Sequence, residues 1–370
     1  MSRVLLTGGA GFIGSHVARR LLECGHRVRV LDDLDPQVHE AGDRPGYLDH
    51  EVELVAGDVR DRSAVERALE GVDRVVHFAA KVGVGQSMYE IAGYTSTNCV
   101  GTAVLLESLL ERPVERLLVA SSMSVYGEGL YRDPKGWFVE DARRSRLQLE
   151  HRRWEPLSRA GEGLEPVPTP ETKVPDLSSV YALTKYDQER LCLMFGSAYD
   201  VPAVALRFFN VYGPDQALSN PYTGVLAIFA SRLLNGRPPK VFEDGEQRRD
   251  FVSVHDVAHA CVLALESDSA VGHTINIGSG RSASVMEVAE RLAKVLDRQD
   301  VEPEITGRYR VGDVRHCFAD IARARELLGY EPAVGLKDGM AELAGWLEGK
   351  VAKDRVDDAT GELASRGLTV

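Results

Sequence analysis

Residues 4–14 read Val-Leu-Leu-Thr-Gly-Gly-Ala-Gly-Phe-Ile-Gly, and this stretch decides the fold. Its first three residues form a short apolar run typical of a buried strand, and a helical pattern of apolar residues follows from Ile13. Between the two stand Gly8, Gly11 and Gly14. Glycine lets a turn approach a pyrophosphate closely, and the N–H groups that open the following helix then face the anion. The stretch therefore predicts a strand, a phosphate-binding turn and a helix.

The next apolar stretch, residues 27–32, ends in a carboxylate that bears on the choice of cofactor. Asp32 stands 18 positions after Gly14, where it can accept hydrogen bonds from both hydroxyls of an adenosine ribose. The same carboxylate would repel a 2′-phosphate. Asp33 follows, and no arginine or lysine stands beside the two acids. The pattern favours NAD over NADP; the alternative is that Asp32 is an ordinary loop carboxylate.

Composition limits the class of protein. The chain has 370 residues, of which 44% are hydrophobic and 27% charged, as in a soluble globular protein large enough for two domains. It has no run of 18 apolar residues, and its N-terminus enters the first strand directly, so we expect neither a membrane span nor a signal peptide. The five cysteines lack paired spacing, which argues against a metal site or a disulfide framework and favours the cytoplasm. A net charge of −12 argues against a nucleic-acid partner.

Apolar strands and amphipathic helices alternate through the first half of the chain. This alternation predicts an α/β fold: a Rossmann-type doubly wound parallel sheet with a smaller mixed α/β substrate lobe. The candidate strands are 3–7, 27–32, 52–56, 73–78, 116–121 and 203–210, with helices such as 63–70 and 98–111 between them. The expected units are a cofactor domain (1–210) with a long charged insertion (128–178), an interleaved second lobe (211–349) and a frayed polar tail (350–370).

Two short segments could carry chemistry. Tyr181 and Lys185 are four residues apart, which places the phenol and the ammonium on one face of a helix. A nearby ammonium lowers the pKa of a tyrosine and lets it act as a base near neutral pH. The second segment, residues 121–127, is a serine-rich turn at the end of a predicted strand, where ligands bind in open α/β sheets. The alternatives are a solvated helix face and an ordinary turn.

Together these segments resemble the extended short-chain dehydrogenase/reductases of the NAD-dependent epimerase/dehydratase family, which act on nucleotide sugars. The resemblance runs from residue 3 to about 345. The matching segments occur in the family's order: Thr7–Gly14, Asp32, Gly57-Asp58-Val59, His77–Ala80, Asn98 with Gly101-Thr102, the serine turn, Tyr181–Lys185, Arg207–Pro214 and Arg249–Asp256.

The resemblance implies a role for each matching residue. Ser122, Tyr181 and Lys185 would be catalytic, with Tyr181 as the acid/base and Lys185 lowering its pKa while binding the nicotinamide ribose. The residues implied to bind NAD are Gly8, Gly11, Phe12, Ile13, Gly14, Asp32, Asp58, Val59, Ala79, Ala80, Tyr181 and Lys185. Those implied to bind a dTDP- or UDP-linked sugar are Ser122, Ser124, Asn210, Arg249, Arg310 and Asp313; no metal ligand is implied.

The resemblance also bears on the reaction. Family 4,6-dehydratases carry an Asp-Glu pair where this chain has Met123 and Ser124, so dehydration by that route is disfavoured. Residues 77–87 look like those of sugar 4-epimerases, in which C4 hydride passes to NAD and returns to the opposite face of a 4-keto sugar. Residues 154–171 are similar to a subgroup that includes dTDP-L-rhamnose 4-epimerases. A nucleotide-sugar dehydratase or decarboxylase, and a non-catalytic NAD-binding regulatory protein, remain the alternatives.

Similar enzymes pair through two long helices. In this chain those helices would be about 96–111 and 181–198, which carry surplus apolar residues such as Leu105, Leu109, Leu191 and Leu193. We therefore expect a homodimer with an isologous interface.

Overall fold

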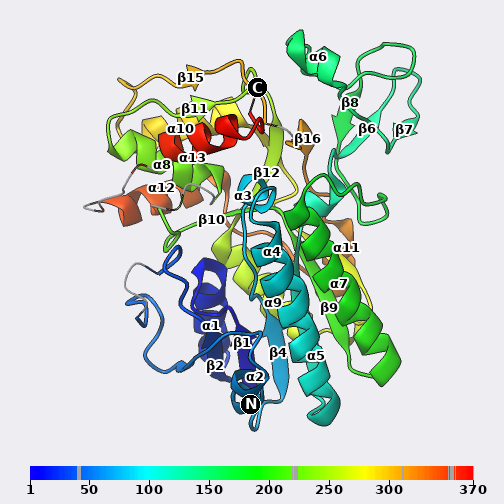
Figure 1. Ribbon diagram of the computed structural model, residues 1–370, viewed down its shortest axis with the longest axis vertical. Coiled ribbons are helices and arrows are strands. Elements are labelled where there is room, and N and C mark those ends of the chain that lie inside the picture. Colours follow the sequence, from blue (N-terminus) through cyan, green and yellow to red (C-terminus); the bar gives the residue numbers. More distant parts are fainter. Residues whose placement is uncertain are drawn as a thin grey trace.

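A seven-stranded, wholly parallel sheet forms the centre of the first lobe (Figure 1). The computed structural model describes residues 1–39, 43–218, 220, 224–310, 312–348, 350, 354 and 356–369. The strands, in spatial order, are β13 (Thr274–Ile277), β9 (Ala203–Phe208), β5 (Arg116–Ser122), β4 (Arg74–His77), β1 (Arg3–Thr7), β2 (Arg27–Asp32) and β3 (Glu53–Ala56). The order reverses between β1 and β4, where ligands bind in such sheets. The predicted Rossmann-type fold is confirmed.

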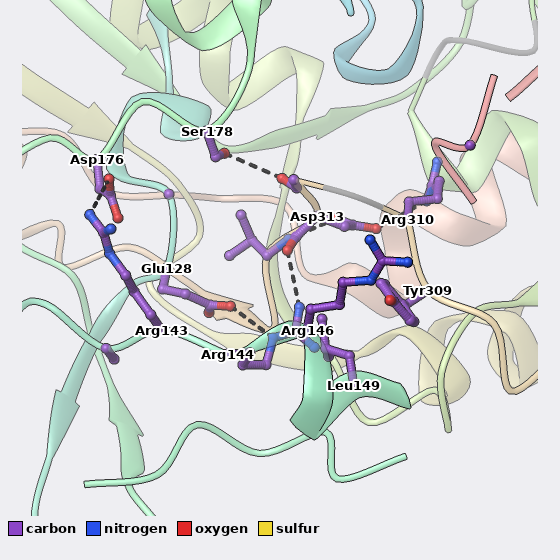
Figure 2. Close-up of a pocket in the computed structure, with 15 residues that line it drawn as sticks. Glu128, Arg143, Arg144, Arg146, Leu149, Asp176, Ser178, Tyr309, Arg310 and Asp313 are labelled. Carbon is purple, nitrogen blue, oxygen red and sulfur yellow. Dashed lines mark hydrogen bonds and ion pairs between the residues drawn. The ribbon is translucent and has the colours of Figure 1, made fainter. Parts of the chain in front are cut away.

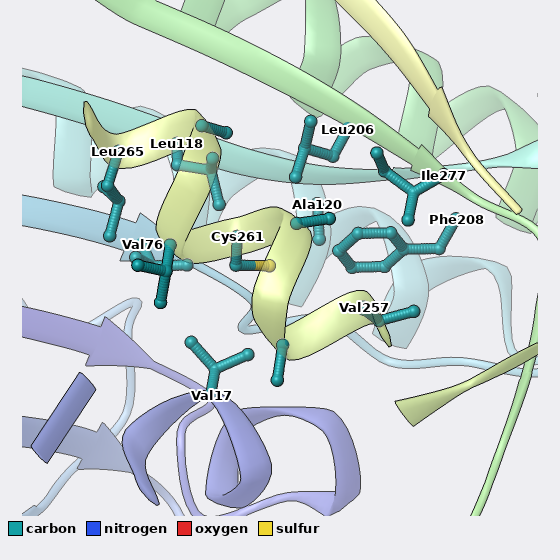
Figure 3. Close-up of a cluster of buried hydrophobic side chains, with 14 of the residues drawn as sticks. Val17, Val76, Leu118, Ala120, Leu206, Phe208, Val257, Cys261, Leu265 and Ile277 are labelled. Atoms are coloured by element: carbon teal, nitrogen blue, oxygen red, sulfur yellow. The ribbon is translucent and has the colours of Figure 1, made fainter. Parts of the chain in front are cut away.

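Helices cover both faces of this sheet because successive strand residues point to opposite sides. On one face, Cys261 of α9 packs among Val17, Leu118 and Leu206 (Figure 3). That face is covered by α1 (Phe12–Glu23), α9 (Val254–Glu266) and α11 (Ala322–Leu328). The other face is covered by α2 (Arg62–Ala68), α5 (Gly101–Glu111) and α7 (Val180–Tyr199). None of the described helices is long and apolar enough to cross a bilayer.

The four leucines expected at a subunit interface differ in how deeply the structure buries them. Leu105 and Leu109 of α5 are fully buried in the core beneath the sheet, and Leu191 and Leu193 of α7 are partly buried against the same core. Leu105 and Leu109 belong to the chain's own core, so the expectation that they form a subunit contact is wrong. A contact through Leu191 and Leu193, which keep part of their surface exposed, stays a prediction. The sequence shows that these residues are apolar, but it does not show which face of each helix packs against the sheet.

The second lobe is a smaller mixed α/β layer. Its four-stranded sheet contains β10 (Asn210–Tyr212), β12 (Arg248–Ser253), β14 (Ser282–Ser284) and β16 (His316–Cys317), and a second pair joins β11 (Lys240–Val241) to β15 (Glu304–Ile305). The helices that pack with it are α8 (Val225–Leu234), α10 (Val285–Val295) and α12 (Leu336–Leu347). Since β13 returns to the first sheet, the chain crosses between the lobes more than once.

The long insertion is folded around a small antiparallel sheet. Its elements are β6 (Leu130–Arg132), β7 (Phe138–Val139), α6 (Arg146–Glu150) and β8 (Glu165–Val167). Ion pairs hold the insertion to the second lobe: Arg144 lies 2.6 Å from buried Glu243, and Arg315 donates from Nε to the Glu155 carboxylate at 2.9 Å. The insertion is thereby fixed beside the loops that carry Arg310 and Asp313.

The C-terminal segment differs from the expected frayed tail. It contains a helix, α13 (Val356–Ser365), in which Ala359 and Leu363 are buried. Leu363 packs beside Gly85, in a short helix of the first lobe, α3 (Val84–Ser87). Only these two side chains of α13 turn fully inward, too few for a recognisable core pattern. The expected tail also included residues 351–353, 355 and 370, which lie outside the described residues.

Candidate active site

The glycine turn packs closely against the backbone around it and leads into the first helix. Gly8 has a φ of +67°, and a Cβ there would lie 2.7 Å from the backbone nitrogen of Ala79. A Cβ on Gly14 would lie 2.6 Å from the Cα of Gly9, so this glycine is needed where the helix crosses the turn. Gly11 differs, because its Cβ would meet only the Gly8 carbonyl oxygen, at 3.5 Å. No side chain caps α1, whose N-terminus begins with Phe12 and Ile13. These features fit a pyrophosphate.

Asp32 ends β2 at the edge of this turn. One carboxylate oxygen accepts a hydrogen bond from the Ala10 N–H at 3.0 Å, and the other accepts from the Leu34 N–H at 2.9 Å. Each oxygen has a second lone pair, which is enough for one ribose hydroxyl apiece. Nε2 of His39 lies 3.7 Å from one of these oxygens. Asp32 is therefore a fixed acceptor beside the turn and not an ordinary loop carboxylate.

A group of acids surrounds the predicted ribose position. Burial raises the pKa of Asp33, and so do the nearby carboxylates of Asp32, Asp35 and Asp58. Such a group would repel a 2′-phosphate, which supports NAD over NADP. Asp58 itself pairs with Arg60, whose hydrogen bond lowers the pKa of that carboxyl.

The other residues implied to line the cofactor lie at the same sheet edge. Val59 is buried against α5, where a Cβ on Gly101 would lie 2.5 Å from its side chain. Ala79 and Ala80 follow β4 directly, and the N–H of Ala79 donates to the hydroxyl of Thr7, the last residue of β1, at 3.3 Å.

Tyr181 lies in the first turn of α7, next to the end of β5. Its phenol and the side chain of Ser122 form a hydrogen bond, and Ser122 in turn accepts from the Ser124 hydroxyl at 3.0 Å. The Tyr181 N–H donates to the Ser87 hydroxyl at 3.0 Å, which anchors the start of the helix. The serine turn thus meets the tyrosine, as the sequence predicted. Burial raises the pKa of Tyr181, and the hydrogen bond with Ser122 offsets part of this rise.

Lys185 is buried and not on a solvated helix face, with 3% of its surface exposed. Its ammonium donates a hydrogen bond to the side-chain oxygen of Gln188 at 2.8 Å. Burial lowers the pKa of Lys185 to about 8. The expectation that Lys185 lowers the pKa of Tyr181 is corrected: burial raises that pKa, and the opposing effect comes from the hydrogen bond with Ser122.

Sequence reasoning assigned no role to three polar residues around this pair. His77 is fully buried and contacts Thr7 at 2.7 Å and Thr102 at 2.9 Å. Asn98 lies in a π-helical turn, Thr95–Val100, and its side-chain amide bonds both the N–H and the carbonyl of Lys81. The third is Gln188. A signal was available for it, because it follows Lys185 by three residues and so shares its helix face.

The residues implied to bind the sugar nucleotide converge from three segments. Arg249 on β12 and Arg310 both approach the carboxylate of Asp313, at 3.5 Å and 3.4 Å. Arg249 also donates to the backbone carbonyl of Arg315 at 2.9 Å, and only 11% of its side chain is exposed. Asn210 begins β10, directly beside β12, and its buried side-chain oxygen has no hydrogen-bond partner among the described residues. An orphaned polar atom at this place fits a polar ligand.

Two of these residues, Arg310 and Asp313, line a cavity of about 500 Å³, whereas Asn210 and Arg249 do not line it (Figure 2). Gly127 and Glu128, which follow the serine turn, and Ser178, three residues before Tyr181, form one side. Arg310 and Asp313 form another. The insertion lines the cavity with Ala142, Arg143, Arg144, Arg146 and Leu149, and the cavity is open to solvent. The volume and the arginines suit a ligand of nucleotide size that carries negative charge.

Comparison with known proteins identifies the family. The model of the NAD-dependent epimerase/dehydratase family matches residues 4–147 and 159–278. A dTDP-L-rhamnose 4-epimerase of Burkholderia thailandensis is 36% identical over 93% of this chain and 94% of its own length. A UDP-glucose 4-epimerase of Mycolicibacterium smegmatis is 32% identical over 94% of this chain and 99% of its own.

Solved structures agree with this assignment. The UDP-glucose 4-epimerase of Thermotoga maritima, solved with UDP-glucose, superposes with a TM-score of 0.77 at 32% identity, covering 94% of this chain and 98% of that one. The UDP-glucose 4-epimerase of Thermus thermophilus, solved with NAD, gives a TM-score of 0.74 at 31% identity, covering 94% and 100%. The resemblance stated from the sequence and the expectation of NAD as the cofactor are both confirmed. The chain belongs to the NAD-dependent epimerase/dehydratase family.

Proposed function

We propose that this protein epimerises a nucleotide-diphosphate sugar at C4. The observation that carries the proposal is the hydrogen bond between the phenol of Tyr181, in the first turn of α7, and Ser122 at the end of β5, with Lys185 one helical turn further on. A phenol held in this way can take a hydroxyl proton from a sugar and return it. The named relatives that act at C4 of nucleotide sugars support the same reaction.

Each residue of the proposed site has its own role. Tyr181 removes the proton of the C4 hydroxyl and later gives it back, and Ser122 holds the same sugar oxygen by a hydrogen bond. Lys185, one helical turn from Tyr181, would bind the nicotinamide ribose. NAD, when bound, would supply the acceptor for the C4 hydride and the donor that returns it. The glycine turn, with Phe12 and Ile13, would bind its phosphates, Asp32 its adenosine ribose, and Asp58, Val59, Ala79 and Ala80 its remaining surface.

The substrate is proposed to lie between the catalytic pair and the second lobe. Ser122 and Ser124 would contact the sugar, and Asn210, Arg249 and Arg310 the diphosphate; Asp313 orients both arginines. We favour a dTDP-linked 6-deoxy sugar over a UDP-linked one. The support is the 36% identity to the rhamnose 4-epimerase, together with residues 154–171.

A decarboxylase is the second candidate reaction, because a UDP-N-acetyl-α-D-glucosaminuronate decarboxylase of Bacillus cytotoxicus is 28% identical over 93% of this chain. The test incubates the purified protein, without added cofactor, with dTDP-L-rhamnose, UDP-glucose, UDP-N-acetylglucosamine and UDP-glucuronate. We expect a C4-inverted product from one of them and no net NADH. Release of carbon dioxide would favour the decarboxylase, and no turnover of any sugar would favour a regulatory NAD-binding protein.

A homodimer through α5 and α7 is also proposed, on residues other than those first expected. Leu183 and Met194 on α7 are 53% and 52% exposed, and their spacing of 11 residues places them on one helix face. Val100, directly before α5, is exposed as well, and α5 packs beside α7. Light scattering should give twice the chain mass. Leu183→Glu with Met194→Glu should give monomers, whereas Leu147→Glu on the insertion should not; a monomeric wild type would refute the proposal.

The five cysteines, Cys24, Cys99, Cys192, Cys261 and Cys317, are all free thiols. This supports the proposal that the protein works in a reducing compartment, the cytoplasm.

A further inference from the structure

The side chain of Gln188 accepts a hydrogen bond from the Lys185 ammonium. The two side chains lie one turn apart on α7, with 2.8 Å between Nζ and Oε1, and both are buried. In the described part of the chain, no carboxylate oxygen lies within 4.0 Å of this ammonium. The buried cation is therefore held by a neutral amide, and two of its three N–H donors remain for other partners.

The other end of the Gln188 amide is fixed by three groups. Its nitrogen lies 2.9 Å from the Thr102 hydroxyl, 3.2 Å from the carbonyl oxygen of Ala79 and 3.1 Å from Nε2 of His77. Turning the amide over would place its NH₂ against an ammonium and its oxygen against a carbonyl oxygen. Both contacts would then be repulsive, so the orientation of Gln188 is determined by its surroundings.

These contacts belong to a buried network of hydrogen bonds at the edge of the sheet. The Thr102 hydroxyl donates to the carbonyl of Asn98 at 2.5 Å, and His77 bridges Thr102 to Thr7. Burial lowers the pKa of His77 to about 3, which keeps its ring neutral. Ala79 is held at both of its backbone groups, since its N–H donates to Thr7 and its carbonyl accepts from Gln188. This network thus connects the backbone of Ala79, beside the proposed cofactor site, to Lys185.

We propose that Gln188 is a positioning residue, which holds the Lys185 ammonium at a fixed place beside Tyr181 and couples that place to the backbone of Ala79. This inference rests on the proposed function of the Tyr181–Lys185 pair. A neutral acceptor suits the task. A carboxylate at position 188 would form an ion pair with the ammonium and hold it in its charged form. An alkyl group would leave a buried ammonium without this acceptor, which favours the neutral amine.

The test measures the titration of Lys185 directly, by NMR of the full protein carrying isotope-labelled lysine, with the signal assigned through Lys185→Met. Gln188→Met should make Lys185 titrate at lower pH than in the wild type, because the charged form loses its acceptor. Gln188→Glu should make it titrate at higher pH. A structural role alone predicts no such opposite shifts. In turnover, both variants should lose about 10-fold in kcat with KM changed less than about 2-fold, since the contact acts on the acid/base pair.

Three further variants keep the test decisive. Thr102→Val removes a hydroxyl that holds the amide and should lower kcat, and Thr102→Ser, which keeps the oxygen, should restore it. Ser108→Ala is the control, since it removes another buried hydrogen bond of α5, to the carbonyl of Val104, away from Lys185. Lys185 titrating as in the wild type in both Gln188 variants would overturn the inference. Should the wild type turn over no sugar, the proposed function fails, but the NMR titration still decides the role of Gln188.

Discussion

Substituting two glycines of the same turn should separate NAD binding from folding. A methyl group on Gly11 meets only the carbonyl oxygen of Gly8, at an ordinary contact distance of 3.5 Å, and the backbone φ of −70° suits alanine. Gly11→Ala should therefore change the free energy of unfolding by less than about 1 kcal/mol. The same methyl fills the space through which a pyrophosphate reaches the backbone. NAD affinity should fall by about 100-fold or more, about 2.7 kcal/mol.

Gly14→Ala should, in contrast, destabilise the fold. Its methyl would lie 2.6 Å from the Cα of Gly9 and 2.8 Å from the carbonyl oxygen of Gly8, so the backbone must move. Overpacking of this kind costs about 1–3 kcal/mol, of which the better helix propensity of alanine returns up to about 1 kcal/mol. Thermal unfolding and the NAD released from each purified variant measure the two effects. A Gly11→Ala protein that keeps its NAD, or that unfolds as early as Gly14→Ala, would refute the reasoning.

Three other substitutions test separate parts of the account. Tyr181→Phe should lower turnover by about 100-fold or more with NAD content unchanged, and near-normal turnover would exclude Tyr181 as the acid/base. Arg310→Ala should weaken sugar-nucleotide binding by about 10-fold to 100-fold in calorimetry while bound NAD stays constant, because the lost contact is to the substrate diphosphate; loss of NAD instead would assign Arg310 to the other site. Asp354→Ala should destabilise the fold by about 2 kcal/mol, since Asp354 is 3% exposed and pairs with buried Arg232 at 3.3 Å. The exposed Asp358→Ala should change stability by less than about 0.5 kcal/mol, and equal unfolding temperatures for the two would contradict the pairing.

The fold was predictable from the sequence because its signals are local. An apolar run followed by Gly8, Gly11 and Gly14 specifies a strand, a turn and a helix within one segment, and each later strand repeats the alternation. The Tyr181–Lys185 pair was predictable for the same reason, since both residues occupy one helix. The side chains that surround the pair come from other elements. His77 ends β4 and Thr102 lies on α5, so their meeting at Gln188 depends on how the elements pack.

Electrostatic effects were harder to predict than positions. Helical spacing brought Lys185 near Tyr181, but the depth of burial that raises the pKa of the phenol follows from the whole fold. In the second lobe, too, the sequence indicated the residues but not all of their contacts. Arg249 and Arg310 were proposed from short motifs, and the structure brings both to Asp313, yet it also engages Arg249 with backbone carbonyls in a way that no sequence spacing indicates. The helix at the C-terminus was missed because its stability depends on two inward residues and distant ion pairs.

The central claim is that C4 hydride leaves the sugar and returns to it within one active site. Its most direct test uses the accepted nucleotide sugar labelled with deuterium at C4, incubated with the purified protein and no added cofactor. The account predicts a C4-inverted product that retains the deuterium at C4, with no accumulation of NADH. Loss of the label to solvent, or a stoichiometric build-up of reduced cofactor, would contradict it.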